Sequence, residues 1–348
     1  MSEALYRKYR PKNFKEIVGQ EHIVSVLENE AKTGKVSHAY LFSGSRGTGK
    51  TSIARIFARA LETNPEDIYE IDAASNRGID EVRAIRDAVH TYPYSSKYKI
   101  YIVDEVHMLT KEAWNAFLKT LEEPPSHVIF IMATTEAHKL PDTVVSRCET
   151  FSFKKPAHGS LVETVLKVAK NEGYVLEKKS ASLIATLALG SFRDAFSVLQ
   201  KAVNASSDKK ISHDEVEKVL GAPKESLVLA VLEGLALSEP EKALGAVRSA
   251  IQENADMEVF LKMILRSLRF VLLLRFAPNQ SVEGASIKNM IIDETGEDEY
   301  KRLETIAKSA KNINSKTLIN FLEAESREAY SSVPELPIEI AIVESCGS

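Results

Sequence analysis

The residues with the clearest chemical potential lie in the run GSRGTGKT, from Gly44 to Thr51. The run matches G-x-x-x-x-G-K-[ST], a pattern in which glycines let the backbone curl until successive N–H groups face phosphate oxygens. The lysine reaches the terminal phosphates, and the next hydroxyl can bind Mg²⁺. The alternative is a glycine-rich turn without a ligand, but the flanking AYLF strand and TSIARIFARAL helix favour a site for ATP. The residues expected to hold ATP are Gly44, Ser45, Arg46, Gly47, Thr48, Gly49, Lys50, Thr51 and Ser52.

An acidic pair follows a second apolar run, in IYIVDEVHML. Asp104 is expected to hold Mg²⁺ together with Thr51, directly or through water, and Glu105 to orient a water molecule for attack on the γ-phosphate. Acidic pairs also end strands without any function. The phosphate-binding motif upstream makes the catalytic interpretation the better one.

Short apolar runs alternate with helical patterns up to about residue 154, which predicts an open α/β fold with a parallel sheet. The expected strands are Ala39 to Phe42, Ile68 to Ile71, Ile100 to Val103 and Val128 to Ala133, each buried on both faces. The expected helices between them are Thr51 to Leu61, Ile79 to His90 and Lys111 to Leu121. After Phe153 the strand signal largely disappears and helical patterns follow. The predicted blocks are residues 1–155, a small helical domain at 156–220, and a second helical domain at 221–348.

Composition excludes several classes of protein. The net charge of −4 leaves no overall basic field, so any contact with DNA has to be local. Cys148 and Cys346 are the only cysteines, which excludes a disulfide framework and fits a reducing cytoplasm. The first residues lack the apolar stretch of a signal peptide. Four cations interrupt the apolar segment Met257 to Phe276, which therefore reads as a buried helix and not a membrane span.

Further strings resemble the bacterial gamma/tau subunits of DNA polymerase III, which are AAA+ clamp-loader ATPases. The matching strings are YRKYRPKNFKEIVGQEHI, EIDAASNRGIDEVR, DEVHMLTKEAWNAFLKTLEEPP and ATTEAHKLPDTVVSRC. The strong match covers about residues 1–200. The resemblance implies a P-loop AAA+ domain, a helical lid domain and an all-helical collar domain that joins subunits.

The resemblance also assigns roles to single residues. Thr135 would be a polar sensor near the γ-phosphate, and Arg147 an arginine finger that acts on the ATP of a neighbouring subunit. Arg193 would read the phosphates of its own subunit from the lid. The N-terminal segment implies contacts with adenine from Tyr9, Arg10, Pro11 and Val18.

The sequence departs from the family pattern in two places. Relatives usually carry a four-cysteine zinc module before EIDAASN, whereas ETNPEDIY bridges this position here, so we expect no zinc. The sequence ends at Ser348, which implies the short form of the family or a truncated chain.

The resemblance implies a clamp-loader function, with other loader subunits, a sliding clamp and primer–template DNA as partners, no membrane partner, and no polymerase active site of its own. Arg77, Arg83 and Lys111, near expected helix starts, are candidates for contact with DNA phosphates. Two alternatives remain: another AAA+ ATPase of DNA repair or recombination, such as a branch-migration motor, and a loader subunit that does not hydrolyse ATP.

Overall fold

A computed structural model describes residues 3–76, 78–206, 208–276, 282–328 and 331–347 of the chain. The chain divides into two compact units. The first unit comprises the chain up to Ser160 together with Gly190–Ser197, and the second comprises Leu161–Leu189 and the chain from Val198 onward. The segment Gly190–Ser197 therefore belongs to the first unit although the residues just before it, Leu161–Leu189, belong to the second.

The first unit is built on a five-stranded sheet with the order β2-β3-β4-β1-β5, in which every neighbouring pair is parallel. The strands are β1 (Ala39–Ser43), β2 (Ile68–Asp72), β3 (Lys99–Asp104), β4 (Val128–Thr134) and β5 (Glu149–Ser152). Because the strands are parallel, the carboxyl ends of β1, β3 and β4 meet at one edge of the sheet. The predicted α/β order is confirmed.

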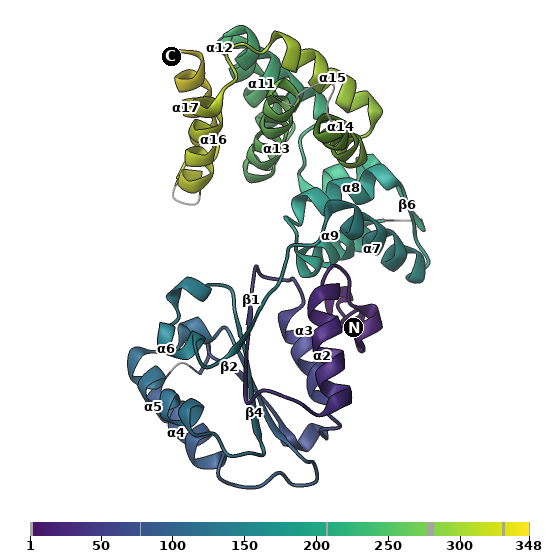
Figure 1. The fold of residues 1–348 in the computed structure, drawn as a ribbon. Coiled ribbons are helices and arrows are strands. Elements are labelled where there is room, and N and C mark those ends of the chain that lie inside the picture. Colours follow the sequence, from purple (N-terminus) through teal and green to yellow (C-terminus); the bar gives the residue numbers. More distant parts are fainter. Residues whose placement is uncertain (1–2, 77, 207, 277–281, 329–330, 348) are drawn as a thin grey trace. The chain divides into compact units, whose positions relative to one another are not determined.

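Helices cover both faces of this sheet (Figure 1). Side chains alternate between the faces, so Tyr40 and Phe42 of β1 pack into one hydrophobic cluster with Phe57, while Leu41 packs into the other with Phe117. The helices and helical turns of this unit are α1 (Leu5–Lys8), η1 (Phe14–Glu16), α2 (Glu21–Thr33), α3 (Lys50–Ala60), η2 (Pro65–Asp67), α4 (Ile79–Ala88), η3 (Val106–Met108), α5 (Lys111–Glu122), η4 (Ala137–Lys139) and α6 (Asp142–Val145).

Two strands differ from the sequence-based expectation. β2 was expected to be buried on both faces, but Tyr69 is 40% exposed and Glu70 and Asp72 are also exposed, because β2 is an edge strand. β5 was not expected, since ETFS is short and its place depends on pairing with β1. Its side chains alternate between half-buried and exposed, which is typical of an edge strand.

In its described residues the second unit is helical apart from two paired two-residue strands, β6 (Val175–Leu176) and β7 (Lys210–Ile211). Its first helices are α7 (His158–Asn171), α8 (Lys178–Leu187), α9 (Phe192–Ala205) and α10 (His213–Leu220), of which α7 and α9 begin with residues of the first unit. α10 begins with a capping box, in which the side chain of Ser212 accepts a hydrogen bond from the N–H of Glu215 and the Glu215 side chain accepts one from the N–H of Ser212. The helices expected after Phe153 are confirmed, whereas the short paired strands β6 and β7 were not expected.

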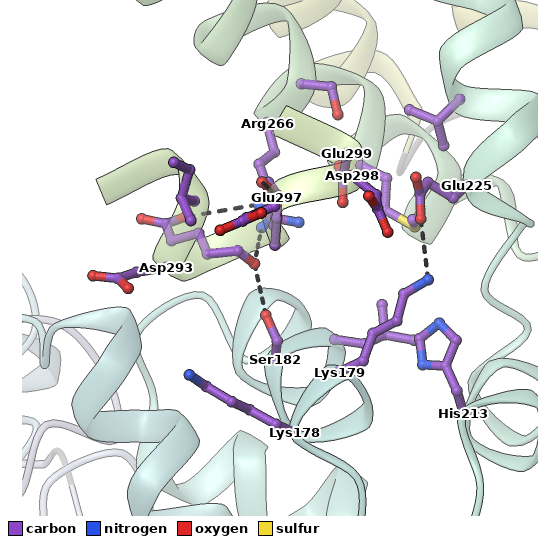
Figure 2. Close-up of a pocket in the computed structure, with 18 of the residues that line it drawn as sticks. Lys178, Lys179, Ser182, His213, Glu225, Arg266, Asp293, Glu297, Asp298 and Glu299 are labelled. Carbon is purple, nitrogen blue, oxygen red and sulfur yellow. Dashed lines mark hydrogen bonds and ion pairs between the residues drawn. The ribbon is translucent and has the colours of Figure 1, made fainter. Parts of the chain in front are cut away.

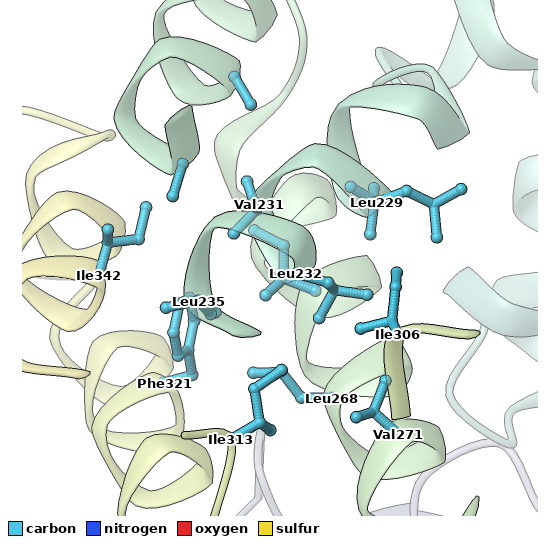
Figure 3. Close-up of a cluster of buried hydrophobic side chains, with 14 of the residues drawn as sticks. Leu229, Val231, Leu232, Leu235, Leu268, Val271, Ile306, Ile313, Phe321 and Ile342 are labelled. Carbon is cyan, nitrogen blue, oxygen red and sulfur yellow. The ribbon is translucent and has the colours of Figure 1, made fainter. Parts of the chain in front are cut away.

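The last seven helices share one hydrophobic core (Figure 3). They are α11 (Glu225–Leu237), α12 (Pro240–Gln252), α13 (Met257–Phe276), α14 (Val282–Thr295), α15 (Glu297–Ser309), α16 (Ser315–Glu328) and α17 (Leu336–Cys346). Leu232, Leu268, Phe321 and Ile342 are all buried in this core. The apolar segment Met257–Phe276, expected to be a buried helix, contributes Phe260, Ile264 and Leu268 to this core. Within the described ranges, no helix has the length and apolar character needed to cross a membrane.

Candidate functional site at the carboxyl edge of the sheet

The glycine-rich loop connects β1 to α3 at the carboxyl edge of the sheet. Gly44, Gly47 and Gly49 have φ values of 145°, 72° and 101°, which side chains rarely allow. At Gly44 an added Cβ would lie 2.6 Å from the carbonyl oxygen of Phe153, so only glycine permits this close approach. The loop therefore has the curled backbone expected of a phosphate cradle, with the N-terminus of α3 beside it.

Lys50 lies inside this loop with only 6% of its surface exposed. Its Nζ donates hydrogen bonds to the carbonyl oxygens of Gly44 at 2.7 Å and Ser45 at 2.9 Å. Burial lowers the pKa of Lys50, and the negative charges of Glu105 and Asp104 act against that shift. The ammonium group is thus held within the loop by two neutral carbonyl oxygens, which phosphate oxygens can replace as hydrogen-bond acceptors.

Thr51 and Asp104 come together although 53 positions separate them in the sequence. The Thr51 hydroxyl donates to Asp104 Oδ2 at 2.7 Å. A hydroxyl and a carboxylate oxygen are ligands that Mg²⁺ prefers, so this donor set fits the metal predicted here. The structure brings both predicted metal ligands to one point beside Lys50.

Glu105 follows β3 in a left-handed backbone conformation, with φ 49° and ψ 44°. Its Oε2 accepts hydrogen bonds from the backbone N–H of Thr135 at 3.3 Å and from the Thr135 hydroxyl at 3.1 Å. Thr135 directly follows β4, the strand next to β3 in the sheet. The residue expected to activate water and the expected sensor are therefore in direct contact.

Arg10 brings the N-terminal segment to α3, where its Nε donates to Ser52 Oγ at 3.0 Å. Burial lowers the pKa of Arg10, and the nearby charges of Arg55 and Arg193 add to this shift. The charges of Glu70 and Asp104 act against the shift, and Arg55 forms an ion pair with Glu70.

Arg193 belongs to the segment Gly190–Ser197 of the first unit. The backbone N–H of Phe192 donates to the carbonyl oxygen of Gly47 at 3.1 Å, which ties this segment to the glycine-rich loop. The Arg193 guanidinium lies 5.5 Å from the centre of the Tyr6 ring. Arg193 is exposed and lies near the cradle, although its side chain rests on an aromatic ring in this state.

The other residues predicted to contact adenine lie on the same N-terminal segment. The ring of Tyr9 is 6.4 Å from that of Phe196. Val18 is 37% exposed and offers an apolar surface. For Tyr9, Pro11 and Val18 the role in adenine binding stays a prediction.

Arg147 follows α6 and is held by two acceptors of its own chain. One terminal nitrogen donates to the carbonyl oxygen of Thr143 at 2.7 Å, and the other pairs with Glu122 at 2.8 Å. Its side chain is 35% exposed. The structure thus groups Arg147 with the end of α5 and not with Lys50 or Thr51.

Two of the candidate DNA contacts lie on helices of the first unit. Arg83 is exposed in the first part of α4 and pairs with Asp80 at 3.2 Å. Lys111 is the exposed first residue of α5, which Thr110 caps through its side chain. Arg77 lies outside the described residues. Contact of these residues with DNA stays a prediction.

Among the described residues, no group of three or more His, Cys, Asp or Glu side chains could hold a metal ion, and the absence of zinc stays a prediction. A cavity of about 320 Å³ lies elsewhere, in the second unit (Figure 2). Charged side chains line it, among them Lys179, Glu225, Arg266 and Glu299, and none of the predicted phosphate-site residues does.

Known proteins resemble this chain over most of its length. A family model described as "DNA polymerase III, delta subunit" matches residues 19–76 and 62–157. DNA polymerase III subunit tau of Bacillus subtilis (strain 168) is 37% identical over 366 residues, covering 99% of this chain and 63% of that protein. The tau subunit of Escherichia coli (strain K12) is 35% identical over 297 residues, covering 79% of this chain and 46% of that protein. The chain thus spans between 46% and 63% of the length of these two relatives.

A solved structure supports the fold class. The Holliday junction branch migration motor RuvB of Thermotoga maritima superposes with a TM-score of 0.53 at 22% sequence identity, covering 65% of this chain and 79% of that one. At this identity the likeness concerns the fold alone. The predicted P-loop AAA+ fold with a mostly helical C-terminal part is confirmed.

Proposed function

Because the chain belongs to the DNA polymerase III gamma/tau family, we propose that it is an ATP-hydrolysing subunit of the replication clamp loader. In this role it uses ATP binding and hydrolysis to load a sliding clamp onto primed DNA. Its partners are the other loader subunits, the clamp and primer–template DNA, and it works in the cytoplasm.

One observation carries the proposal: Lys50, the Thr51–Asp104 pair and the Glu105–Thr135 pair converge at one edge of the sheet. These contacts join three strands that are far apart in the sequence. A protein that only kept the fold would have no need of a hydroxyl–carboxylate pair beside a buried lysine. The convergence therefore supports hydrolysis over passive binding.

The mechanism begins with ATP in the glycine-rich loop. The backbone N–H groups of the loop and the Lys50 ammonium hold the phosphates, and Lys50 gives up its contacts with Gly44 and Ser45 as it turns to them. Thr51 and Asp104 would hold Mg²⁺, which would supply positive charge to the phosphate oxygens. Glu105 orients the attacking water, and Thr135 keeps the Glu105 carboxylate facing the γ-phosphate.

The reaction is completed by a neighbouring subunit. Arg147, held at the end of α5, stabilises the charge that develops on the neighbour's γ-phosphate, an effect that can reach about 10³–10⁵ in rate in related phosphoryl transfer. Arg193 contacts the phosphates within the same subunit. Hydrolysis then loosens the assembly, and the closed clamp is released.

The helical C-terminal part joins subunits in this proposal. Ile319 and Leu322 lie three residues apart on α16 and are 52% and 48% exposed, and Val343 on α17 is 54% exposed. Apolar side chains that stay in solvent on packed helices are suited to contact between protomers. We assign residues 221–348 to this collar, 156–220 to the lid and 1–155 to the ATPase domain.

The test is phosphate release measured with and without sliding clamp and primed DNA. We expect turnover that clamp and primed DNA raise together. Glu105→Gln should retain ATP binding but lose turnover by roughly 10²–10⁴-fold, and Lys50→Ala should lose ATP binding. A protein without affinity for ATP, or with turnover indifferent to Glu105→Gln, would contradict the proposal.

The same assay separates the two alternatives. Turnover that DNA stimulates and the clamp does not would favour a DNA motor, the activity named for the RuvB structure. ATP binding without turnover under every condition would favour a loader subunit that only binds nucleotide.

A further inference from the structure

A buried histidine stands directly behind the candidate catalytic residues. His107 lies in η3, the turn that follows Glu105, and its side chain is only 6% exposed. Buried polar side chains are stable only when their hydrogen-bonding atoms have partners. The partners of this ring therefore show what it holds in place.

Both ring nitrogens of His107 face polar groups. Nε2 lies 3.0 Å from Glu136 Oε2. Nδ1 lies 3.1 Å from Thr134 Oγ1 and 3.5 Å from Glu105 Oε2. The Glu136 carboxylate can only accept, so Nε2 carries a proton and donates to it, while Nδ1 faces the Thr134 hydroxyl.

The groups on the far side of the ring are themselves fixed. The backbone N–H of Glu136 donates to Thr134 Oγ1 at 3.0 Å, and Lys139 pairs with the Glu136 carboxylate at 2.8 Å. These contacts and those of His107 form a closed network of hydrogen bonds at the end of β4, directly beside Thr135. His107 therefore links the turn after β3 to the turn after β4.

The link that His107 makes between the two turns affects the position of Glu105. The left-handed backbone at Glu105 is unfavourable for a residue with a side chain, so contacts of the surrounding turn must maintain it. The same carboxylate oxygen of Glu105, Oε2, accepts from the Thr135 hydroxyl at 3.1 Å and lies 3.5 Å from His107 Nδ1. Without the His107 imidazole, the turn η3 would lose its hydrogen bonds to Thr134 and Glu136.

We propose that His107 is a positioning residue for ATP hydrolysis, which fixes Glu105 against Thr135 by bridging Thr134 and Glu136. The proposal rests on the hydrolytic function proposed above. His107 touches neither of the expected metal ligands, and its effect passes through the carboxylate of Glu105.

The main test is His107→Ala, with ATP affinity and turnover measured separately. Misplacement of a reacting group by a fraction of an ångström to about 1 Å can cost roughly 100-fold in rate. We therefore expect turnover to fall roughly 10- to 100-fold while the Kd for ATP stays within about twofold, because Lys50 and Thr51 are untouched. Equal losses in affinity and turnover would point to a general loss of structure and overturn the proposal.

Three further variants separate a loss of positioning from a general loss of structure. His107→Gln retains an N–H that can reach Glu136 and should restore part of the turnover. Glu136→Ala removes that acceptor from a partly exposed position, where folding is tolerant, and should reproduce part of the loss. His138→Ala removes an exposed histidine from the neighbouring turn η4 and should leave turnover unchanged.

The decisive comparison uses a Glu105→Gln background. If His107 acts through Glu105, adding His107→Ala to Glu105→Gln causes no further loss of turnover, since coupled residues are not additive. A further tenfold loss in that background would overturn the proposal. If Glu105→Gln itself leaves turnover intact, the proposed function fails together with this inference. If Glu105→Gln lowers turnover but His107→Ala does not, only the inference about His107 is wrong.

Discussion

Single residues in rare backbone conformations shape the phosphate site. Gly47 and Gly49 lie in the left-handed region, and so does Glu105, which has a side chain. The glycines adopt it without steric cost, whereas Glu105 needs the contacts of the turn that follows it. The site therefore depends on the conformation of a few residues as much as on their chemistry.

Gly47 is the residue where this dependence can be measured. An added Cβ would collide with Ser191 Oγ, and the Gly47 carbonyl accepts the N–H of Phe192. Gly47→Ala should therefore lower the free energy of unfolding of the first unit by more than the roughly 1–2 kcal/mol of left-handed strain alone, and should weaken ATP binding. Urea unfolding and an ATP titration measure the two effects.

Gly34 supplies a matched control for this substitution. Its φ of 69° is close to the 72° of Gly47, but nothing lies within 4 Å of its added Cβ. Gly34→Ala thus carries the backbone strain without the collision. Equal destabilisation by the two substitutions would show that the contact with Ser191 contributes nothing.

Elements whose signal is local could be predicted from the sequence. β1, the glycine-rich loop and α3 follow one another directly, so the apolar run, the glycines and the helical pattern locate all three. The same holds for β3 and for the Asp104–Glu105 pair that follows it. The residues that form the cradle were predicted for this reason.

Elements whose place depends on distant partners could not be predicted. β2 carries Glu70 and Asp72 among its apolar residues, which is compatible with an exposed strand, but that it lies at the edge of the sheet follows only from its pairing with β3 alone. β5 is recognisable only through its pairing with β1. The proposed role of His107 depends on groups from other elements, which spacing along the chain does not reveal.

The first turn of α15 contains a carboxyl group that makes stability depend on pH. Burial raises the pKa of Glu299 to about 7 in the folded chain, although Arg266 nearby acts in the opposite direction. Glu225 adds to the rise, while Lys179 and Arg302 oppose it. Glu299, Arg266, Glu225 and Lys179 line the charged cavity shown in Figure 2.

The sign of the effect follows from proton binding. Between the ordinary pKa of 4.5 and about 7, the folded chain binds more protons at Glu299 than the unfolded chain. The free energy of unfolding should therefore fall as pH rises through this window, by an amount on the order of 1–3 kcal/mol. Glu299→Gln should flatten this part of the curve, as measured by urea unfolding between about pH 4 and pH 8.

A neighbouring carboxyl group serves as the control. Glu297 is exposed on the same turn of α15, so Glu297→Gln should leave the pH dependence of unfolding as it is in the unaltered protein. If Glu299→Gln and the unaltered protein gave parallel curves, the raised pKa of Glu299 would have no part in stability.

The whole molecule is, in the proposed function, only part of a catalytic unit. Lys50, Thr51, Asp104 and Glu105 converge within one chain, whereas Arg147 is held at the end of α5 by Glu122 and Thr143. These two anchors use two of the five N–H donors of a guanidinium, which leaves the others for a phosphate. An arginine held in this way can serve a second copy without any rearrangement of its own chain.

A mixing experiment tests this division of labour. Arg147→Ala keeps its own phosphate site but lacks the finger, and Lys50→Ala has lost the site but keeps the finger, so each alone should show little turnover in an assembly containing several copies. Mixed in equal amounts, they should recover turnover at about a quarter of the contacts between copies, if assembly is random. A double variant, Lys50→Ala with Arg147→Ala, mixed with Arg147→Ala should recover none. Absence of recovery in the first mixture, with co-assembly verified, would mean that Arg147 does not act on a neighbour.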